Sequence, residues 1–148
     1  MRALIQRTKG VKVFINNDLH SSSQAGLLVL FGTREGDTAD RIDKLADKIV
    51  NLRIFEDSAG KMNLSLLDIK GELMVVSQFT LYANTNKGRR PSFNEAQNPA
   101  DAEKLYERFV TEISKSGLKT ASGRFGASMD IHFDNDGPVT ILLDTDDY

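Results

Sequence analysis

The sequence predicts an α+β fold, because segments with strand periodicity surround two segments with helical periodicity. Apolar residues alternate with polar ones near both ends of the chain, as in Val11, Val13 and Ile15. Two interior segments instead repeat their apolar residues every three or four positions, as an amphipathic helix does. The 148 residues suffice for one sizeable core, so we expect a single domain over residues 1–148.

In the N-terminal half, alternation and apolar runs predict three strands, at Arg2–Arg7, Val11–Ile15 and Gly26–Phe31. A turn at Lys9-Gly10 and a polar loop at 21–23 separate these strands. A helix then begins at Asp37 or Thr38, either of which is a suitable cap, and runs to about Asn51. A short strand follows at Arg53–Phe55, and the state of Leu64–Leu67 is left open.

The C-terminal half opens with the strongest strand candidate, Glu72–Leu81, and continues into a long irregular stretch, 83–98. Asn98 followed by Pro99 is a typical helix start, and Gly117 ends that helix. The last third is β again, with two alternating segments joined by a turn at 135–138. The sum is a mostly antiparallel sheet with two main helices.

Composition excludes several function classes. Nineteen Lys and Arg against 21 Asp and Glu give a net charge of −2, so any nucleic acid must be held by a local patch. The chain has no Cys and only two His, which leaves no thiolate nucleophile and no His-rich metal centre. We therefore expect no metal and no cofactor. No apolar run is long enough to span a membrane, and without an export signal we expect a cytoplasmic protein.

Nucleophile candidates lie at the end of the 72–81 strand, where Ser77 and Thr80 flank Gln78 and Phe79. Strand alternation puts Ser77 and Phe79 on one face, and Gln78 and Thr80 on the other. A hydroxyl attacks a carbonyl efficiently only when a base takes its proton. His20 and His132 are distant in sequence, so these hydroxyls can equally be structural.

Three further segments are compatible with ligand binding without requiring it. Lys87, Arg89 and Arg90 sit in a loop with Gly and Pro, and guanidinium groups bind phosphates and stack on bases. The segment 123–126 offers two glycines that allow close backbone approach. The Gly137-Pro138 bond is trans by default, whereas a cis bond would let two successive carbonyls form a rigid clamp without side chains.

Taken together and in order, these segments resemble D-aminoacyl-tRNA deacylases of the bacterial and eukaryotic type over essentially the whole chain. The most specific matches are Ser77-Gln78-Phe79-Thr80 and Asn135-Asp136-Gly137-Pro138-Val139-Thr140. Further matches are Met1–Arg7, Gly26–Leu30, Arg53–Phe55, Gly60–Leu64, Gly88–Phe93, and Gly123–Ala127 with Met129. None of these segments departs from the family pattern.

The resemblance implies a homodimer with a β-barrel-like α+β architecture and cross-subunit active sites. The implied reaction is hydrolysis of the ester between a D-amino acid, or mischarged glycine, and the 3′ end of tRNA. Ser77, Gln78, Phe79 and Thr80 of one subunit would form the catalytic site. Gly137 and Pro138 of the other, with a cis bond, would enter it and reject L-amino acids. Phe125 and Met129 would line the pocket, with Lys87, Arg89 and Arg90 nearby for tRNA; neither membrane nor DNA is expected as a partner.

Chemistry favours an RNA-assisted mechanism, because an aminoacyl ester is already activated and the adenosine 2′-hydroxyl lies beside it. Backbone N–H groups near Phe79 and Thr80 would stabilise the oxyanion. Three alternatives stay open. Thr80 is a covalent nucleophile in the same reaction; the chain is a non-catalytic RNA- or nucleotide-binding module; or it hydrolyses another small activated ester.

Overall fold

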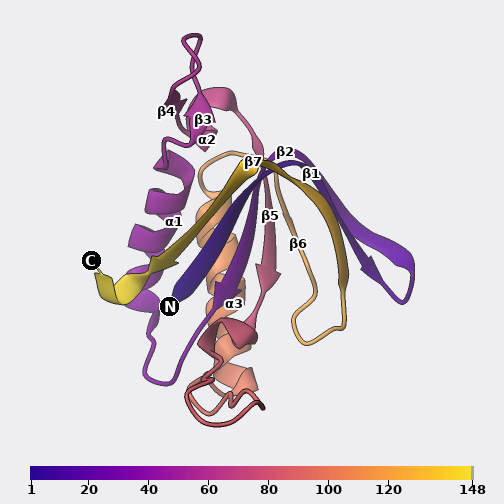
Figure 1. The fold of residues 1–148 in the computed structure, drawn as a ribbon, viewed down its shortest axis with the longest axis vertical. Coiled ribbons are helices and arrows are strands. Elements are labelled where there is room, and N and C mark those ends of the chain that lie inside the picture. The colour runs from indigo at the N-terminus through magenta and orange to yellow at the C-terminus, as the bar shows by residue number, and fades with distance from the viewer. Residues whose placement is uncertain (148) are drawn as a thin grey trace.

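The computed structural model describes residues 1–147 and is built on one mixed five-stranded sheet with the order β6-β5-β2-β1-β7 (Figure 1). Its strands are β1 (Arg2–Ile15), β2 (Asp18–Gly32), β5 (Glu72–Ser77), β6 (Thr120–Ser122) and β7 (Asp130–Asp144). The pairs β1·β2 and β1·β7 are antiparallel, whereas β2·β5 and β5·β6 are parallel. The α+β class is confirmed, but the sheet is mixed and does not close into a barrel within residues 1–147.

The helices are α1 (Ile42–Asn51), the short α2 (Leu66–Ile69) and α3 (Pro99–Ser114), so the two main helices were predicted correctly. Helix α3 begins as expected, because the Asn98 side chain accepts from the Asp101 amide. A 3-10 turn, Ala39–Arg41, precedes α1, and the Thr38 side chain makes no capping bond. A two-stranded sheet of β3 (Phe55–Glu56) and β4 (Met62–Leu64) lies between α1 and α2. No helix among residues 1–147 is long and apolar enough to cross a membrane.

The N-terminal half has one long hairpin where we expected three strands. The predicted turn at Lys9-Gly10 lies inside β1, and the predicted loop at 21–23 lies inside β2, so both predictions are wrong. The true turn is Asn16-Asn17, whose φ values of 53° and 68° suit a tight hairpin turn. Strand pairing therefore overrides the local glycine and serine signals.

The sequence-based boundaries of the later strands also need correction. Strand β5 ends at Ser77 rather than Leu81, and a 3-10 turn, Phe79–Tyr82, follows it. The predicted turn at 135–138 lies inside the continuous β7, where its pairing with β1 is irregular between Gln6 and Val11. Phe79 and Thr80 therefore lie in a 3-10 turn instead of a strand. Gly137 and Pro138 lie in an irregularly paired part of a strand instead of a turn.

The hydrophobic core lies between the sheet and helices α1 and α3, which pack side by side on one face (Figure 1). Phe31 of β2 stacks on Phe109 of α3, with ring centroids 4.3 Å apart, and so joins the sheet to the helix. A second cluster lies where the far half of the hairpin curls over Leu28, Met74 and Val76. These two clusters pack against the ends of β2 and β5, where a cavity opens.

Candidate active site

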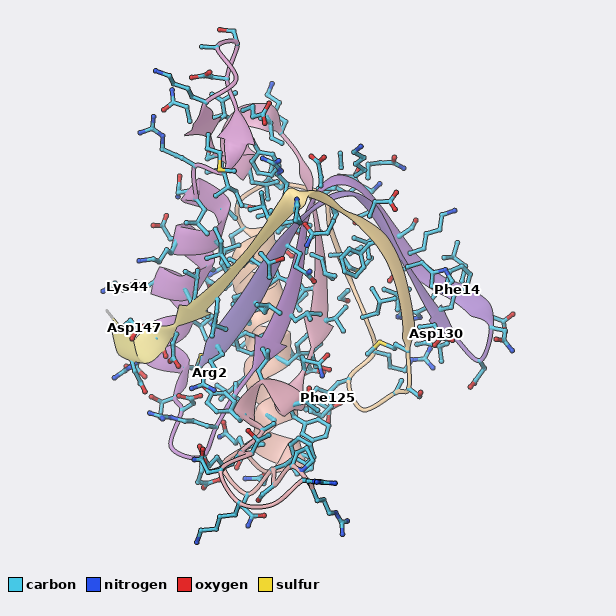
Figure 2. The ribbon with its side chains drawn as sticks, viewed as in Figure 1. Arg2, Phe14, Lys44, Phe125, Asp130 and Asp147 are labelled. Atoms are coloured by element: carbon cyan, nitrogen blue, oxygen red, sulfur yellow. The ribbon has the colours of Figure 1, made fainter. Side chains whose placement is uncertain are left out.

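A cavity of about 640 Å³ opens at the C-terminal end of β5. Its walls come from the ends of β2 and β5, the turn after β5, the start of α3 and the loop before β7. The predicted residues Ser77, Gln78, Phe79, Phe125 and Met129 all line it. Figure 2 shows Phe125 near the end of β5, on the loop that leads into β7. The fold therefore brings together two segments that are nearly fifty residues apart in sequence.

The turn after β5 leaves two backbone donors without a helical partner. The Gln78 amide donates to the Phe31 carbonyl of β2 at 2.7 Å, which fixes the turn to the sheet. The Leu81 amide is the first in the turn to donate a hydrogen bond to a carbonyl of the turn, that of Gln78, at 3.3 Å. The amides of Phe79 and Thr80 precede it and have no partner inside the turn, as is usual for the first residues of a helical turn. Two adjacent N–H groups are thus available beside the cavity.

Thr80 itself differs from the other predicted catalytic residues. Its side chain is exposed and is not part of the cavity wall. Its hydroxyl oxygen accepts a short hydrogen bond from the Gln78 side-chain amide. An amide donor cannot take a proton from a hydroxyl, so this contact does not activate Thr80 as a nucleophile.

Tyr106 supports the wall that carries Phe125 and Met129. Its buried hydroxyl donates to the Val75 carbonyl at 2.9 Å, and its ring lies 5.9 Å from that of Phe125. Burial raises the pKa of Tyr106 to about 12, so it remains a neutral donor at physiological pH. Gly123 allows Met129 to approach, because a Cβ there would lie 2.7 Å from the Met129 sulfur.

The Gly137-Pro138 pair does not reach this cavity in the same chain. It lies on β7, three strands from β5 across the sheet. Along the strand direction it is level with Arg7 of β1, about four residues from the level of Ser77. Strand spacing and rise give a separation of roughly 20 Å. Both residues are exposed, and the bond between them is cis. Buried Arg7 supports the preceding residue by donating to the Asp136 carbonyl at 3.0 Å and to the Ile54 carbonyl at 2.5 Å.

The three predicted RNA-binding cations occupy a loop at the rim of the cavity. We call residues 84–92 the basic loop. A two-way backbone bridge between Asn84 and Ser92 closes its base, at 2.8 and 2.9 Å. Lys87, Arg89 and Arg90 lie between these ends and are exposed.

Sequence reasoning missed Gly32 and Tyr106 as parts of the site. A Cβ on Gly32 would lie 2.6 Å from the Gln78 carbonyl oxygen, so the turn after β5 needs a glycine there. The only local signal for Gly32 is its place directly after the predicted strand Gly26–Phe31, which by itself indicates a strand end. Tyr106 lies at an apolar position of the predicted helix that starts at Pro99, and helical spacing does not reveal its hydrogen bond to β5.

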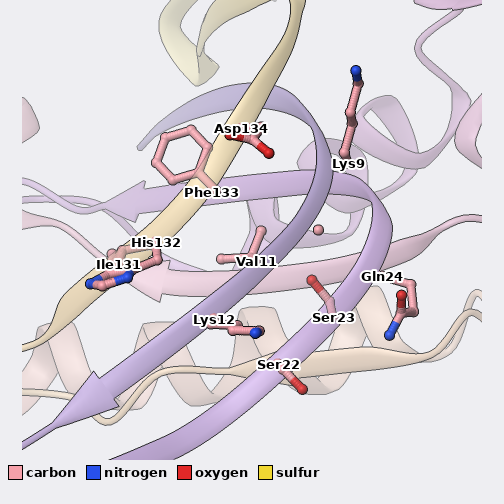
Figure 3. Close-up of a pocket in the computed structure, with 11 residues that line it drawn as sticks. Lys9, Val11, Lys12, Ser22, Ser23, Gln24, Ile131, His132, Phe133 and Asp134 are labelled. Atoms are coloured by element: carbon pink, nitrogen blue, oxygen red, sulfur yellow. The ribbon is translucent and has the colours of Figure 1, made fainter. Parts of the chain in front are cut away.

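A second cavity, of about 650 Å³, lies on the curled half of the hairpin (Figure 3). Lys12 and His132 line it, and His132 packs against Phe14 with ring centroids 5.0 Å apart. Neither histidine of the chain lines the first cavity. Among residues 1–147, no group of three His, Asp or Glu side chains is arranged to hold a metal ion.

Known proteins are similar to this chain over nearly its whole length. The family model described as D-Tyr-tRNA(Tyr) deacylase matches residues 4–144. Proteins named D-aminoacyl-tRNA deacylase from Aquifex aeolicus (strain VF5) and Thermosipho africanus (strain TCF52B) are 57% and 54% identical over 145 residues. These alignments cover 98% of this chain and 98% and 97% of the relatives.

Two solved structures have the same fold. A c-Myc DNA unwinding element binding protein superimposes with a TM-score of 0.91 at 38% identity, covering 97% of this chain and 98% of its own. A structure titled as a probable eukaryotic D-amino acid tRNA deacylase gives a TM-score of 0.84 at 18% identity, covering 96% and 97%. The second likeness concerns the fold alone.

Proposed function

The chain belongs to the D-Tyr-tRNA(Tyr) deacylase family, and on that premise we propose that it hydrolyses the ester linking a D-amino acid to the 3′ end of tRNA. The observation that carries the proposal is the cavity lined by Ser77, Gln78 and Phe79, with two unpaired amides beside it. A cavity of about 640 Å³ is large enough for an aminoacyl-adenosine end.

In the proposed reaction, a water molecule attacks the ester carbonyl carbon, and negative charge develops on the carbonyl oxygen. The Phe79 and Thr80 amides donate to that oxygen, and such donors are worth about 3 kcal/mol each in comparable hydrolases. The ribose 2′-hydroxyl positions and activates the water. The carbon–oxygen bond to the 3′ position then breaks, and the 3′ oxygen receives a proton, which yields free amino acid and tRNA.

The geometry supports this mechanism over covalent attack by Thr80. A covalent route needs a base beside the hydroxyl, and the Thr80 hydroxyl is hydrogen-bonded to the Gln78 side-chain amide, which is a donor. Neither His20 nor His132 lines the cavity. Main-chain donors and the substrate's own hydroxyl need no such base.

We further propose that chirality is read by Gly137-Pro138 of a second copy of this chain. Within one chain the pair lies roughly 20 Å from Ser77 by strand counting, too far to enter its own cavity. Because glycine and proline present mainly backbone, their carbonyls would hold the substrate ammonium and leave no room for an L side chain. Selection would thus be by steric exclusion.

An apolar row on the helix-free face supports a homodimer. Strand register puts Val76, Leu30, Leu4 and Leu142 opposite one another across four strands. Val76 is already buried beneath the curled hairpin, whereas Leu30 and Leu4 are half-buried and Leu142 is 53% exposed. No helix among residues 1–147 covers this face, so a second sheet seated there would bury the exposed part of the row and bring the partner's β7 toward the cavity.

Exclusion of L side chains also implies that mischarged glycyl-tRNA is a substrate, because glycine has no side chain to exclude. The test is release of free amino acid from D-Tyr-tRNA, Gly-tRNA and L-Tyr-tRNA. We expect hydrolysis of the first two only. Release from D- and L-Tyr-tRNA alike would refute the clamp, whereas tRNA binding without cleavage would favour a non-catalytic RNA-binding module.

The cross-subunit arrangement has its own test. One variant replaces Gly32 with Trp to block the cavity, and another replaces Gly137 with Trp to block the clamp. In a cross-subunit dimer, mixing the two inactive variants regenerates one intact site, with up to about a quarter of wild-type activity at random assembly. No recovery, with dimer exchange verified by mass, would refute the arrangement.

A further inference from the structure

We propose that the Phe79–Phe93 pair and the basic loop form a binding site for the unpaired nucleotides that precede the terminal adenosine. The inference rests on the proposed function and extends it from the reacting ester to the RNA behind it. The ligand class is a short single-stranded RNA end, held by base stacking and by phosphate contacts.

The aromatic half of this site lies at the rim of the cavity. Phe79 and Phe93 both line the cavity, yet their side chains are 56% and 37% exposed. Their rings meet edge to face, with centroids 5.0 Å apart and planes at 70°. This arrangement covers at most one face of one ring, so flat aromatic surface remains free. Exposed ring faces beside a nucleotide-sized cavity are typical stacking platforms for unpaired bases.

The cationic half is the basic loop. Its nine residues carry three positive charges and no acidic residue. Since the whole chain has a net charge of −2, the remainder carries −2 − 3 = −5. Lys87, Arg89 and Arg90 make no ion pair with any other residue in 1–147. The basic loop therefore brings three unpaired positive charges together at the rim of the cavity.

The two halves are close enough to hold consecutive parts of one strand. Arg90 precedes Phe93 by three residues, which limits their Cα separation to about 11 Å. The bridge between Asn84 and Ser92 holds the loop base, and the Asn84 side chain donates to Glu95 at 2.7 Å. A base stacked on Phe93 would thus have its phosphate within reach of the Arg89 and Arg90 side chains.

Stacking requires a base that is free of Watson–Crick pairing, which distinguishes this proposal from docking on the acceptor duplex. Duplex RNA presents its phosphates but hides its base faces. The single-stranded 3′ end offers both features.

The experiment measures binding of a labelled RNA hexanucleotide ending in CCA, by fluorescence anisotropy, to the full-length protein. Phe93→Leu keeps apolar bulk and removes the aromatic face. We expect it to weaken binding about tenfold, within the range for loss of one stacked base. Arg89→Ala/Arg90→Ala tests the phosphate contacts, and Lys115→Ala/Lys119→Ala is the matched control, which removes the same charge from the other end of α3.

Salt dependence separates the two halves of the site. Three phosphate contacts give a slope of log affinity against log salt of about −2, and the Arg89→Ala/Arg90→Ala variant reduces it to about −0.7. Phe93→Leu lowers affinity without changing the slope. The Lys115→Ala/Lys119→Ala control keeps both the wild-type affinity and the wild-type slope.

The outcomes distinguish this inference from the proposed function. Wild-type affinity in Phe93→Leu, or an unchanged slope in the arginine variant, overturns the inference even when D-Tyr-tRNA is hydrolysed. Equal effects on a blunt RNA duplex that lacks the CCA end also overturn it. Loss of binding as expected, with no hydrolysis by the wild type, supports the RNA site and refutes the deacylase instead.

Discussion

Substitution of Gly32 by Ala should impair catalysis far more than folding. Gly32 ends β2, and a Cβ at this position would lie 2.6 Å from the Gln78 carbonyl oxygen and 3.3 Å from the Leu81 side chain. The Gln78 carbonyl belongs to the backbone and accepts the Leu81 amide at 3.3 Å, so it cannot rotate away freely. Relief of the contact to about 3.4 Å requires the turn after β5 to move by roughly 0.8 Å.

That movement would displace the two amides that are proposed to stabilise the oxyanion, because Phe79 and Thr80 follow Gln78 directly. A misplacement of about 1 Å in a catalytic group lowers rates about 100-fold, which is the decrease we expect in kcat. Overpacking at a buried site lowers the free energy of unfolding by about 1–3 kcal/mol, so the protein should remain folded at 25 °C. Single-turnover hydrolysis of D-Tyr-tRNA measures the first effect, and urea unfolding measures the second.

Gly71→Ala is the matched control. A Cβ on Gly71 would lie 2.6 Å from the Leu66 side chain and 3.1 Å from that of Ile69. The clash is as close as at Gly32, but it meets flexible side-chain ends at the opposite end of β5. We expect Gly71→Ala to lower stability while kcat stays within about twofold. Equal kcat in Gly32→Ala and the wild type, with the fold intact, would refute the role of the amides.

Three other changes have expected outcomes. Thr80→Ala should retain substantial turnover in the tRNA assay because the proposed mechanism does not use the hydroxyl as a nucleophile; complete loss with an intact fold would favour the covalent mechanism. Arg7→Leu should lower the free energy of unfolding by about 3 kcal/mol, since two carbonyls lose a buried charged donor, and wild-type denaturant midpoints would contradict this. The hydrogen bond from the Gln24 amide, at 2.7 Å, lowers the pKa of Glu72 from its ordinary value of 4.5. Its contribution to stability is therefore complete above that value and is lost as the pH falls through the lowered pKa, so Glu72→Gln should flatten the acid limb of the unfolding curve.

Local signals in the sequence were sufficient where one residue type decides the structure. Asn98 and Pro99 fixed the start of α3, and its apolar face was identified from helical spacing. They were insufficient where pairing partners decide. The serines at 21–23 pair with Val11–Val13 and are strand residues, although their composition is typical of a loop.

The candidate site divides in the same way. The sequence identified the segments around Ser77 and Phe125 as candidate site segments, each by itself. The cavity that both segments line depends on the parallel pairing of β5 and β6, which no local sequence pattern encodes. The turn that follows Ser77 is fixed by the hydrogen bond from the Gln78 amide to the Phe31 carbonyl, 47 residues earlier. Local alternation extended the strand to Leu81 because it contains no information about that contact.

Strand β7 joins the two properties that the proposed mechanism needs, rigidity and exposure. Val139 and Leu143 are buried on the helix side of the sheet, while Leu142 faces the opposite side and is exposed. Gly137 and Pro138 precede this anchored segment, and Arg7, itself only 6% exposed, holds the carbonyl of the residue before them. Selection by exclusion fails if the excluding group can retreat by the width of a methyl group. An exposed backbone element can therefore discriminate between enantiomers only when buried groups fix it, and the Arg7 contacts provide that support without placing any side chain in the path of the substrate.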